Sequence, residues 1–263
     1  MRRPPSRFYR RVLFPAGFAA LVMSGCAGFF KADGILTETD PYFLFRKVRE
    51  HAAKLGTFEG RASWTAVSEE GGFRGTTHVV LKSPDSLWMK VEGPFGIDMA
   101  IVSVTGGRFL LFSPFLKAAY SGDAGGSRID QLLPLGPAFS KDITGTAGLL
   151  IPGDSLLESL TLFFPEKDEY VLAFGTGDRL RIQKKGPVVS RWEKCDSSGA
   201  AVWLWEAERF RNRSGLRLPL VIRVNAERGR RLTVFYETVK ANPALRKGWC
   251  HVPIPEDVET KTL

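Results

Sequence analysis

The chain has 263 residues, of which 44% are hydrophobic and 25% charged, as is typical of a globular protein that buries a core. Its net charge of +9 includes five arginines within the first eleven residues, so the rest of the chain carries only +4. This small surplus, with no basic run beside stacking aromatic residues, argues against nucleic acid as a partner. It is compatible with modest attraction to anionic lipid headgroups.

Residues 1–25 are predicted to be a secretory signal peptide. The arginines precede a short apolar run, which Pro15 interrupts and small residues follow. The run is too short to be a good membrane span. Its end, Met23-Ser24-Gly25-Cys26, resembles the lipobox of bacterial lipoproteins. This resemblance implies that Cys26 carries a diacylglyceryl group and is the first residue of the mature protein. The alternative is an ordinary signal peptide cleaved nearby, with Cys26 incidental.

A tether and a helix are expected next. Residues 26–39 show little periodicity and predict a tether to a domain that spans residues 40–263. Asp40 is expected to be the N-cap of a helix, with Pro41 in the first turn and Gly56 as the C-cap. One face of the helix is apolar, at Leu44, Val48, Ala52 and Leu55.

Segments of alternating apolar residues then predict an antiparallel meander, because Gly- and Pro-containing turns separate them. The first group comprises residues 58–66, 73–81, 87–91, 99–105, 108–112 and 117–121. A weakly helical insert is predicted at residues 127–151. The second group comprises residues 170–174, 180–183, 188–194, 201–209, 219–224 and 231–236. The tail from Lys240 to Leu263 has the composition of a loop.

Six stretches carry a pattern of apolar positions and turns that resembles a known family. They are Leu55–Ala62, Ser83–Val91, Gly93–Gly96, Leu218–Ile222, Val239–Pro243 and His251–Pro255. With the order of elements, they are similar to the LolA/LolB group of bacterial lipoprotein-localisation factors. The similarity is greatest to the outer-membrane lipoproteins of unassigned function that share that fold. It covers residues 40–258 and includes no catalytic signature.

The resemblance implies a mainly β, α+β fold: an unclosed antiparallel β half-barrel of about eleven strands, with helices over its concave face. In that family the concave face accepts acyl chains of lipoproteins. Two or three small helices cannot fill a large concave sheet, which independently favours an apolar cavity. We expect the ligand to contact Trp64, Val79, Leu81, Met89, Val91, Met99 and Ile101. The alternative for each of these residues is plain core packing.

The loop from Gly93 to Ile97 places bulky apolar residues where turns normally carry polar ones. In LolB-like proteins a loop in this region protrudes and touches the membrane through an apolar residue, typically Leu. The resemblance implies the same role for Phe95, with Ile97 beside it. The alternative is that Phe95 folds back onto the core.

The sequence predicts no catalytic site, metal site or cofactor. His51, His78 and His251 are not spaced with second ligands as metal motifs require, and no G-x-S-x-G elbow is present. Glu206 and Glu208 share a strand face, which a solvated surface explains. Cys195 and Cys250 could pair in an oxidising periplasm or remain thiols, and their spacing leaves both alternatives open.

Together these features predict a lipoprotein anchored in the outer membrane and facing the periplasm. Ala27, rather than Asp, after the lipidated cysteine is compatible with export to the outer membrane under the usual Gram-negative sorting rule. Its expected partners are membrane lipid or the acyl chains of lipoproteins, together with a periplasmic carrier protein. We expect a monomer that accepts or transfers these ligands without catalysing a reaction. The alternative is a structural envelope lipoprotein that uses the same half-barrel to hold a protein partner.

Overall fold

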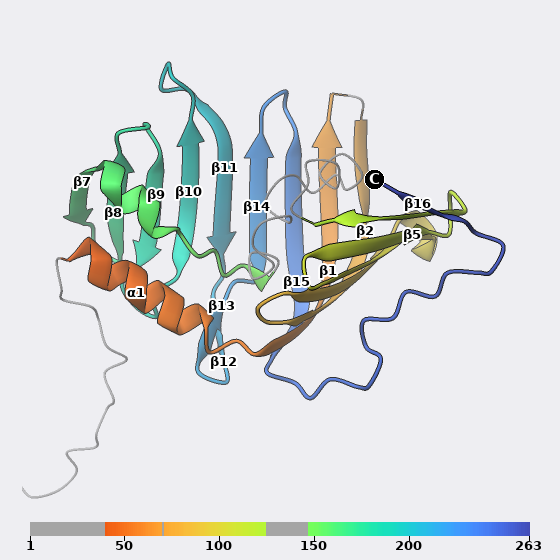
Figure 1. Ribbon diagram of the computed structural model, residues 1–263. Coiled ribbons are helices and arrows are strands. Elements are labelled where there is room, and N and C mark those ends of the chain that lie inside the picture. Colours follow the sequence, from red (N-terminus) through yellow and green to blue (C-terminus); the bar gives the residue numbers. More distant parts are fainter. Residues whose placement is uncertain (1–39, 70, 125–146) are drawn as a thin grey trace, which may run out of the picture. The chain divides into compact units, whose positions relative to one another are not determined.

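One long antiparallel sheet, with a helix lying across it, forms the described part of the chain (Figure 1). A computed structural model describes residues 40–69, 71–124 and 147–263, all within one of the two units into which the chain divides. The predicted signal peptide, the tether, Cys26 and most of the predicted helical insert lie outside the described residues.

The helix α1, Pro41–Ala52, begins as predicted. Asp40 has an extended backbone, and its carboxylate accepts a hydrogen bond from the backbone N–H of Tyr42 at 3.0 Å. Pro41 occupies the first turn, where its missing N–H costs no helical hydrogen bond. The buried face of the helix consists of Leu44, Phe45, Val48, His51 and Ala52.

The predicted end of this helix is wrong. Its C-cap is Ala53, and Gly56 lies in the connection that follows. This connection is held from outside the helix by Asn242, whose side-chain oxygen accepts hydrogen bonds from the N–H groups of Gly56 and Thr57 at 2.8 and 3.1 Å. Gly56 therefore contacts a distant segment of the chain and does not cap the helix.

The first half of the sheet is a meander of six strands that match the first predicted group. They are β1 (Thr57–Ser68), β2 (Gly71–Lys82), β3 (Ser86–Glu92), β4 (Asp98–Thr105), β5 (Arg108–Ser113) and β6 (Ala118–Asp123). One turn of 3-10 helix, η1 (Pro94–Gly96), connects β3 to β4. Each strand pairs with the next in antiparallel register.

The second half contains the six strands of the second predicted group and several elements that the sequence does not predict. The expected strands are β8 (Glu169–Phe174), β9 (Arg179–Gln183), β10 (Val189–Cys195), β11 (Ala201–Glu208), β14 (Val221–Ala226) and β15 (Arg231–Ala241). The additional elements are η3 (Asp154–Ser159), β7 (Leu160–Pro165), the separate hairpin of β12 (Arg211–Arg213) and β13 (Leu216–Leu218), and β16 (Thr260–Thr262).

Pairing between β1 and β15 joins the two halves into one sheet of 14 strands. Its order is β16-β6-β5-β4-β3-β2-β1-β15-β14-β11-β10-β9-β8-β7. The edge strands β7 and β16 do not pair with each other, so the sheet stays open. The predicted unclosed half-barrel is therefore confirmed, with 14 strands rather than about eleven.

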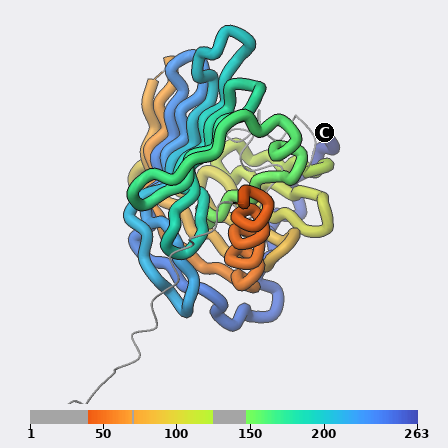
Figure 2. Tube along the Cα trace, turned by 90° about the vertical axis from the view of Figure 1, so that its left-hand side faces the viewer, coloured from red at the N-terminus to blue at the C-terminus, as the bar shows by residue number. Residues whose placement is uncertain are grey.

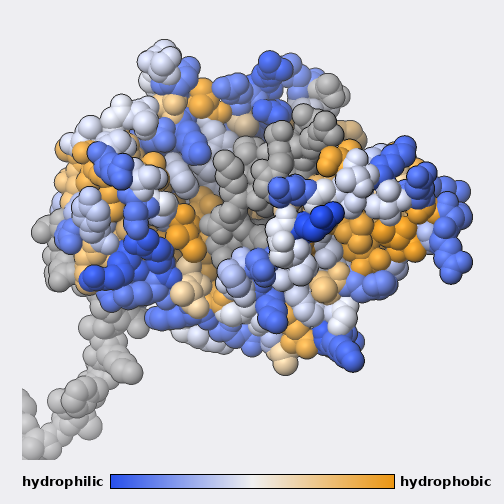
Figure 3. Space-filling view, in the orientation of Figure 1, coloured by the Kyte–Doolittle hydropathy of each residue, from blue (hydrophilic) through white to orange (hydrophobic). Residues whose placement is uncertain are grey.

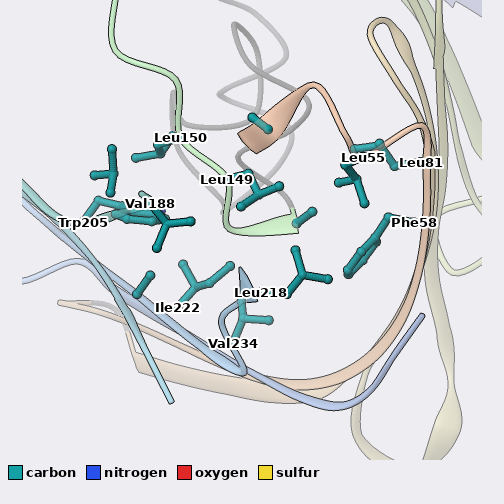
Figure 4. Close-up of a cluster of buried hydrophobic side chains, with 14 of the residues drawn as sticks. Leu55, Phe58, Leu81, Leu149, Leu150, Val188, Trp205, Leu218, Ile222 and Val234 are labelled. Atoms are coloured by element: carbon teal, nitrogen blue, oxygen red, sulfur yellow. The ribbon is translucent and has the colours of Figure 1, made fainter. Parts of the chain in front are cut away.

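The main core lies on the concave side of the sheet, where α1 crosses it (Figures 1 and 2). Side chains from both halves of the sheet meet covering segments there (Figure 4). The covering segments are α1, the chain around Leu149 and Leu150, η3 with Leu157, and the β12–β13 hairpin with Leu216 and Leu218. They bury the apolar face that a curved sheet must otherwise expose to water.

A second, smaller cluster lies on the opposite side of β3 to β6. Ile101, Phe112 and Ala119 meet Val252 from the C-terminal segment. The indole N–H of Trp88 donates to the backbone carbonyl of His251 at 3.1 Å, which holds this segment against the strands. The segment then ends as β16, which pairs in parallel with β6. The predicted loop-like tail thus covers an apolar surface and one sheet edge.

Candidate functional site

Five of the seven predicted ligand-contacting residues lie together on the concave face. Val79 and Leu81 on β2 and Met89 on β3 are at most 2% exposed within the main core. Trp64 and Val91 are partly buried and pack against the same core. Their alternation along neighbouring strands brings them to one face, as strand geometry requires. Their contact with a ligand stays a prediction.

The predicted position of Ile101 is wrong. Met89 faces Val102 across the β3–β4 ladder, and Lys90 faces Ile101, so Ile101 points to the convex side. There it is buried against the C-terminal segment. A β-bulge opposite Val91 and Glu92 leaves Met99 out of the register, and Met99 belongs to neither core cluster.

The described covering segments bury their own side chains against the concave face. Phe45 of α1 and Leu216 and Leu218 of the β12–β13 hairpin are completely buried against the sheet. A pocket of about 450 Å³ lies elsewhere, lined by polar residues such as Glu169, Arg181 and Glu206. Where α1 and the β12–β13 hairpin cover the sheet, an acyl chain would have to displace them to reach the residues beneath.

Only a few polar contacts hold α1 to its neighbours in the described part of the chain. The imidazole Nε2 of His51 accepts a hydrogen bond from the backbone N–H of Arg217 at 3.2 Å. Arg49 forms an exposed ion pair with Asp154 at 2.6 Å, a contact that is weak in water. Burial lowers the pKa of His51 and thereby favours its neutral, hydrogen-bond-accepting form.

Six exposed apolar side chains lie on hairpins that turn at the same end of the sheet. Because the strands alternate in direction, the β1–β2, β3–β4 and β5–β6 turns share that end. We call these residues the apolar rim: Val67, Phe73, Phe95, Ile97, Phe115 and Leu116, with exposed fractions between 43% and 100%. Figure 3 shows hydrophobic surface on the right-hand side, where the ends of β3 to β6 and the C-terminal segment lie.

Phe95 is the most exposed member of the apolar rim, at 100%. It has a positive φ of 62°, which is unfavourable for a bulky residue and marks a constrained turn. The alternative in which Phe95 folds back onto the core is therefore excluded, and its contact with a membrane stays a prediction. Phe115 and Leu116 are not predicted as membrane-contact residues, although Pro114-Phe115 repeats the Pro94-Phe95 pair at the next hairpin of the rim.

The remaining candidate groups have structural partners. Glu206 pairs with Arg191 at 2.8 Å, and Glu208 pairs with Arg223, on the convex side of the sheet. Within the described ranges, no three His, Cys, Asp or Glu side chains gather as metal ligands. Nor does any described helix have the length and apolar character needed to cross a bilayer.

Cys195 and Cys250 are both free thiols. Cys195 ends β10, whereas Cys250 precedes the residue that contacts Trp88 on β3. The two strands are six positions apart in the sheet. Both thiols are free, so the pairing that the sequence leaves open is not formed in this structure.

Comparisons with known proteins identify the fold. No family model and no curated protein sequence matches the chain. A DUF1329 family protein from Desulfovibrio piger is similar with a TM-score of 0.57 and 11% identity, over 80% of this chain and 95% of that one. A LolA superfamily protein from Nitrosomonas europaea is similar with a TM-score of 0.52 and 13% identity, over 79% and 96% of the two chains.

A putative outer membrane lipoprotein-sorting protein domain from Vibrio parahaemolyticus is similar with a TM-score of 0.51 and 9% identity, over 78% of this chain and 94% of that one. At these identities the likeness concerns the fold. Together with the open sheet and the covered concave face, it shows that this chain has a LolA/LolB-like fold.

Proposed function

We propose that this protein is a periplasm-facing lipoprotein, anchored in the outer membrane through Cys26, that binds acyl chains or lipidated proteins on the concave face of its half-barrel. Its role would be the localisation of lipoproteins or lipids, by binding and release rather than by catalysis. The observation that carries the proposal is the continuous apolar core between the sheet and its covering segments. The names of two similar structures, a LolA superfamily protein and a lipoprotein-sorting domain, support the same role.

Binding would require the covering segments to separate from the sheet. The apolar side chains of α1 and of the β12–β13 hairpin would be replaced by acyl methylenes, which recover about 0.8 kcal/mol each on burial. Because acyl methylenes would replace apolar side chains against the sheet, the free-energy cost of separating the covering segments stays low. The weak exposed ion pair between Arg49 and Asp154 adds little resistance to it.

The apolar rim supports contact between this protein and a membrane. Three neighbouring hairpins present Phe73, Phe95 and Phe115, and apolar area exposed to water is unfavourable by about 25 cal/mol per Å². Insertion at a bilayer interface relieves this cost. Arg74 and Lys117 are exposed on the same hairpins and would attract anionic headgroups.

The alternative function is that of a structural envelope lipoprotein whose half-barrel holds a protein partner. One observation favours it: α1 and the β12–β13 hairpin already bury side chains of the chain itself against the concave face. Mass spectrometry of a denatured extract of the purified protein separates the two functions. The proposal predicts non-covalent acyl species in the extract. Their absence, together with a co-purifying protein, would support the alternative.

A matched pair of variants locates the bound acyl species. Met89→Glu and Ile101→Glu each place a carboxylate at a side chain that is at most 7% exposed, on neighbouring strands but on opposite faces. Both should lower stability, because a buried charge is costly. Only Met89→Glu should remove the acyl species, and equal retention by both variants would contradict binding on the concave face.

A further inference from the structure

Two tryptophans on the concave face have indole N–H groups that find no hydrogen-bond partner among the described residues. Trp192 on β10 and Trp203 on β11 form a T-shaped pair, with ring centroids 6.0 Å apart. Considering residues 40–69, 71–124 and 147–263, both Nε1 atoms are buried and neither donates to an acceptor. By contrast, Trp64 and Trp88 each donate to a backbone carbonyl. A buried donor without an acceptor is unfavourable and calls for an explanation, such as a bound water or ion.

Lys194 places a positive charge over both rings. It lies directly opposite Trp203 in the β10–β11 ladder, and its ammonium is 5.0 Å from the ring centroid of Trp192 and 5.5 Å from that of Trp203. The residue is exposed, and no carboxylate of the described residues forms an ion pair with it. The adjacent Glu193 pairs with Arg191 on the opposite face. The three side chains therefore supply donors and positive charge without an acceptor.

This group lies where the apolar core of the concave face ends. Trp192 pairs across the sheet with Trp205, which is 1% exposed, and with Leu180, which is fully buried. Both Trp192 and Trp203 pack against that core. An apolar surface next to a cluster of hydrogen-bond donors is suited to binding an amphiphile. The acyl chain would lie on the apolar surface, and the anionic headgroup would contact the donors.

We propose that Trp192, Trp203 and Lys194 bind the phosphate of a lipid headgroup whose acyl chain lies on the concave face. The inference rests on the proposed function and adds the chemical class of its ligand. Phosphate oxygens accept hydrogen bonds from indole N–H groups and form stronger, charge-assisted bonds with an ammonium. The flexible stem of Lys194 lets its ammonium move from the ring faces onto the phosphate.

The test compares three ligands by calorimetric titration of the purified full chain. Palmitoyl lysophosphatidylglycerol carries both an acyl chain and a phosphate. Monopalmitoylglycerol carries the acyl chain alone, and glycerol 3-phosphate carries the phosphate alone. We expect the lysophospholipid to bind about tenfold more tightly than monopalmitoylglycerol, as one charge-assisted contact provides. Glycerol 3-phosphate should bind far more weakly than the lysophospholipid.

Two variants remove the proposed contacts, and two controls match them. Lys194→Met keeps the apolar stem of an exposed side chain, and Trp203→Phe keeps an aromatic ring without the N–H. Both should reduce the preference for the lysophospholipid to less than about threefold while monopalmitoylglycerol still binds. Lys184→Met removes another lysine that lies over a ring, 5.4 Å from Tyr170, and Trp88→Phe removes an indole on the convex side. Both controls should keep the preference.

Each outcome has a defined meaning. Equal binding of the two palmitoyl compounds by the wild type, or an unchanged preference in Lys194→Met, would overturn the headgroup site and leave the proposed function standing. Glycerol 3-phosphate binding as tight as that of the lysophospholipid would identify a free phosphate ester instead and overturn the lipid assignment. Failure of every palmitoyl compound to bind would overturn the proposed function and this inference together.

Discussion

His51 on α1 accepts a hydrogen bond through its imidazole Nε2 from the backbone N–H of Arg217 on β13, at 3.2 Å. This contact joins two of the segments that cover the concave face. The imidazole is 6% exposed and can accept the bond only in its neutral form. Burial, and secondarily the positive charge of Lys54, lowers the pKa of His51 below the ordinary value of 6.5.

Stability should therefore depend on pH through His51. Because the folded-state pKa is lowered, its contribution is complete above pH 6.5. It decreases as the pH falls below 6.5, where the unfolded chain takes up the proton first, and it is lost once the pH passes the folded-state value. We expect the melting temperature of the wild type to fall more between about pH 7.5 and about pH 5.5 than that of His51→Gln.

The glutamine variant is the control, because its side-chain oxygen can accept the same N–H without titrating. Thermal unfolding at several pH values, followed by circular dichroism, provides the measurement. Parallel pH dependences for the two proteins would show that His51 does not link α1 to β13 in the way described.

The faces of β2 and β3 could be predicted from sequence because their two sides differ in chemistry. His78 and Lys82 on β2 and Lys90 on β3 mark the opposite face, so period-two geometry assigns Val79, Leu81 and Met89 to the core, although Val80 and Trp88 are apolar too. The resemblance to the LolA/LolB group added the open half-barrel, which local pattern alone does not give. The strands β1 and β15 lie far apart in the chain, so no local turn connects them and no short-range sequence pattern predicts their pairing.

The face of β4 could not be predicted because both of its sides are apolar. Val102 faces the main core, whereas Ile101 is covered by Val252 from the C-terminal segment. Alternation cannot distinguish two buried faces, and the bulge at Met99 shifts the phase further. The strand β16 is three exposed residues long, and only its pairing with β6 defines it.

The apolar rim should contribute to membrane association without contributing to stability. Phe95→Glu removes a fully exposed side chain, so we expect the free energy of unfolding to change by less than about 0.5 kcal/mol. Binding to vesicles that contain anionic lipid should weaken several-fold. The measurement is vesicle co-sedimentation of a soluble form that begins after Cys26, so that the lipid anchor does not mask the effect.

Tyr42→Glu is the matched control for Phe95, because Tyr42 is an aromatic residue, 61% exposed, on α1 and away from the apolar rim. Its vesicle binding should equal that of the unmodified soluble form. If Phe95→Glu binds as the control does, the rim does not contact the membrane through this residue.

The C-terminal segment should be essential for stability despite its lack of regular structure. Val252 is 5% exposed over Ile101 and Phe112, so Val252→Asp should lower the free energy of unfolding by about 2 kcal/mol or more. Lys247→Asp introduces the same carboxylate at an exposed position in the segment and should have little effect. Chemical denaturation measures both variants, and similar midpoints would show that the segment covers the cluster without stabilising it.

Anchoring should depend on Cys26, because Met23-Ser24-Gly25-Cys26 ends the apolar run of the signal peptide. Cys26→Ala should release the protein from membranes or leave the signal peptide uncut, since two or three acyl chains are needed for stable anchoring. Fractionation with immunoblotting detects both outcomes. Cys250→Ala, at a free thiol, is the control. Normal processing and membrane association of Cys26→Ala would contradict lipidation.

The central claim is that the concave face accepts an acyl chain, and photo-crosslinking tests it most directly. A palmitate analogue with a diazirine near the chain end, irradiated with the purified protein, should label residues that line this face. The account predicts labelled peptides that contain Val79, Leu81, Met89 or Leu149 and label that unmodified palmitate displaces. Labelling confined to the convex cluster of Ile101, Phe112 and Val252, or label that palmitate does not displace, would contradict it.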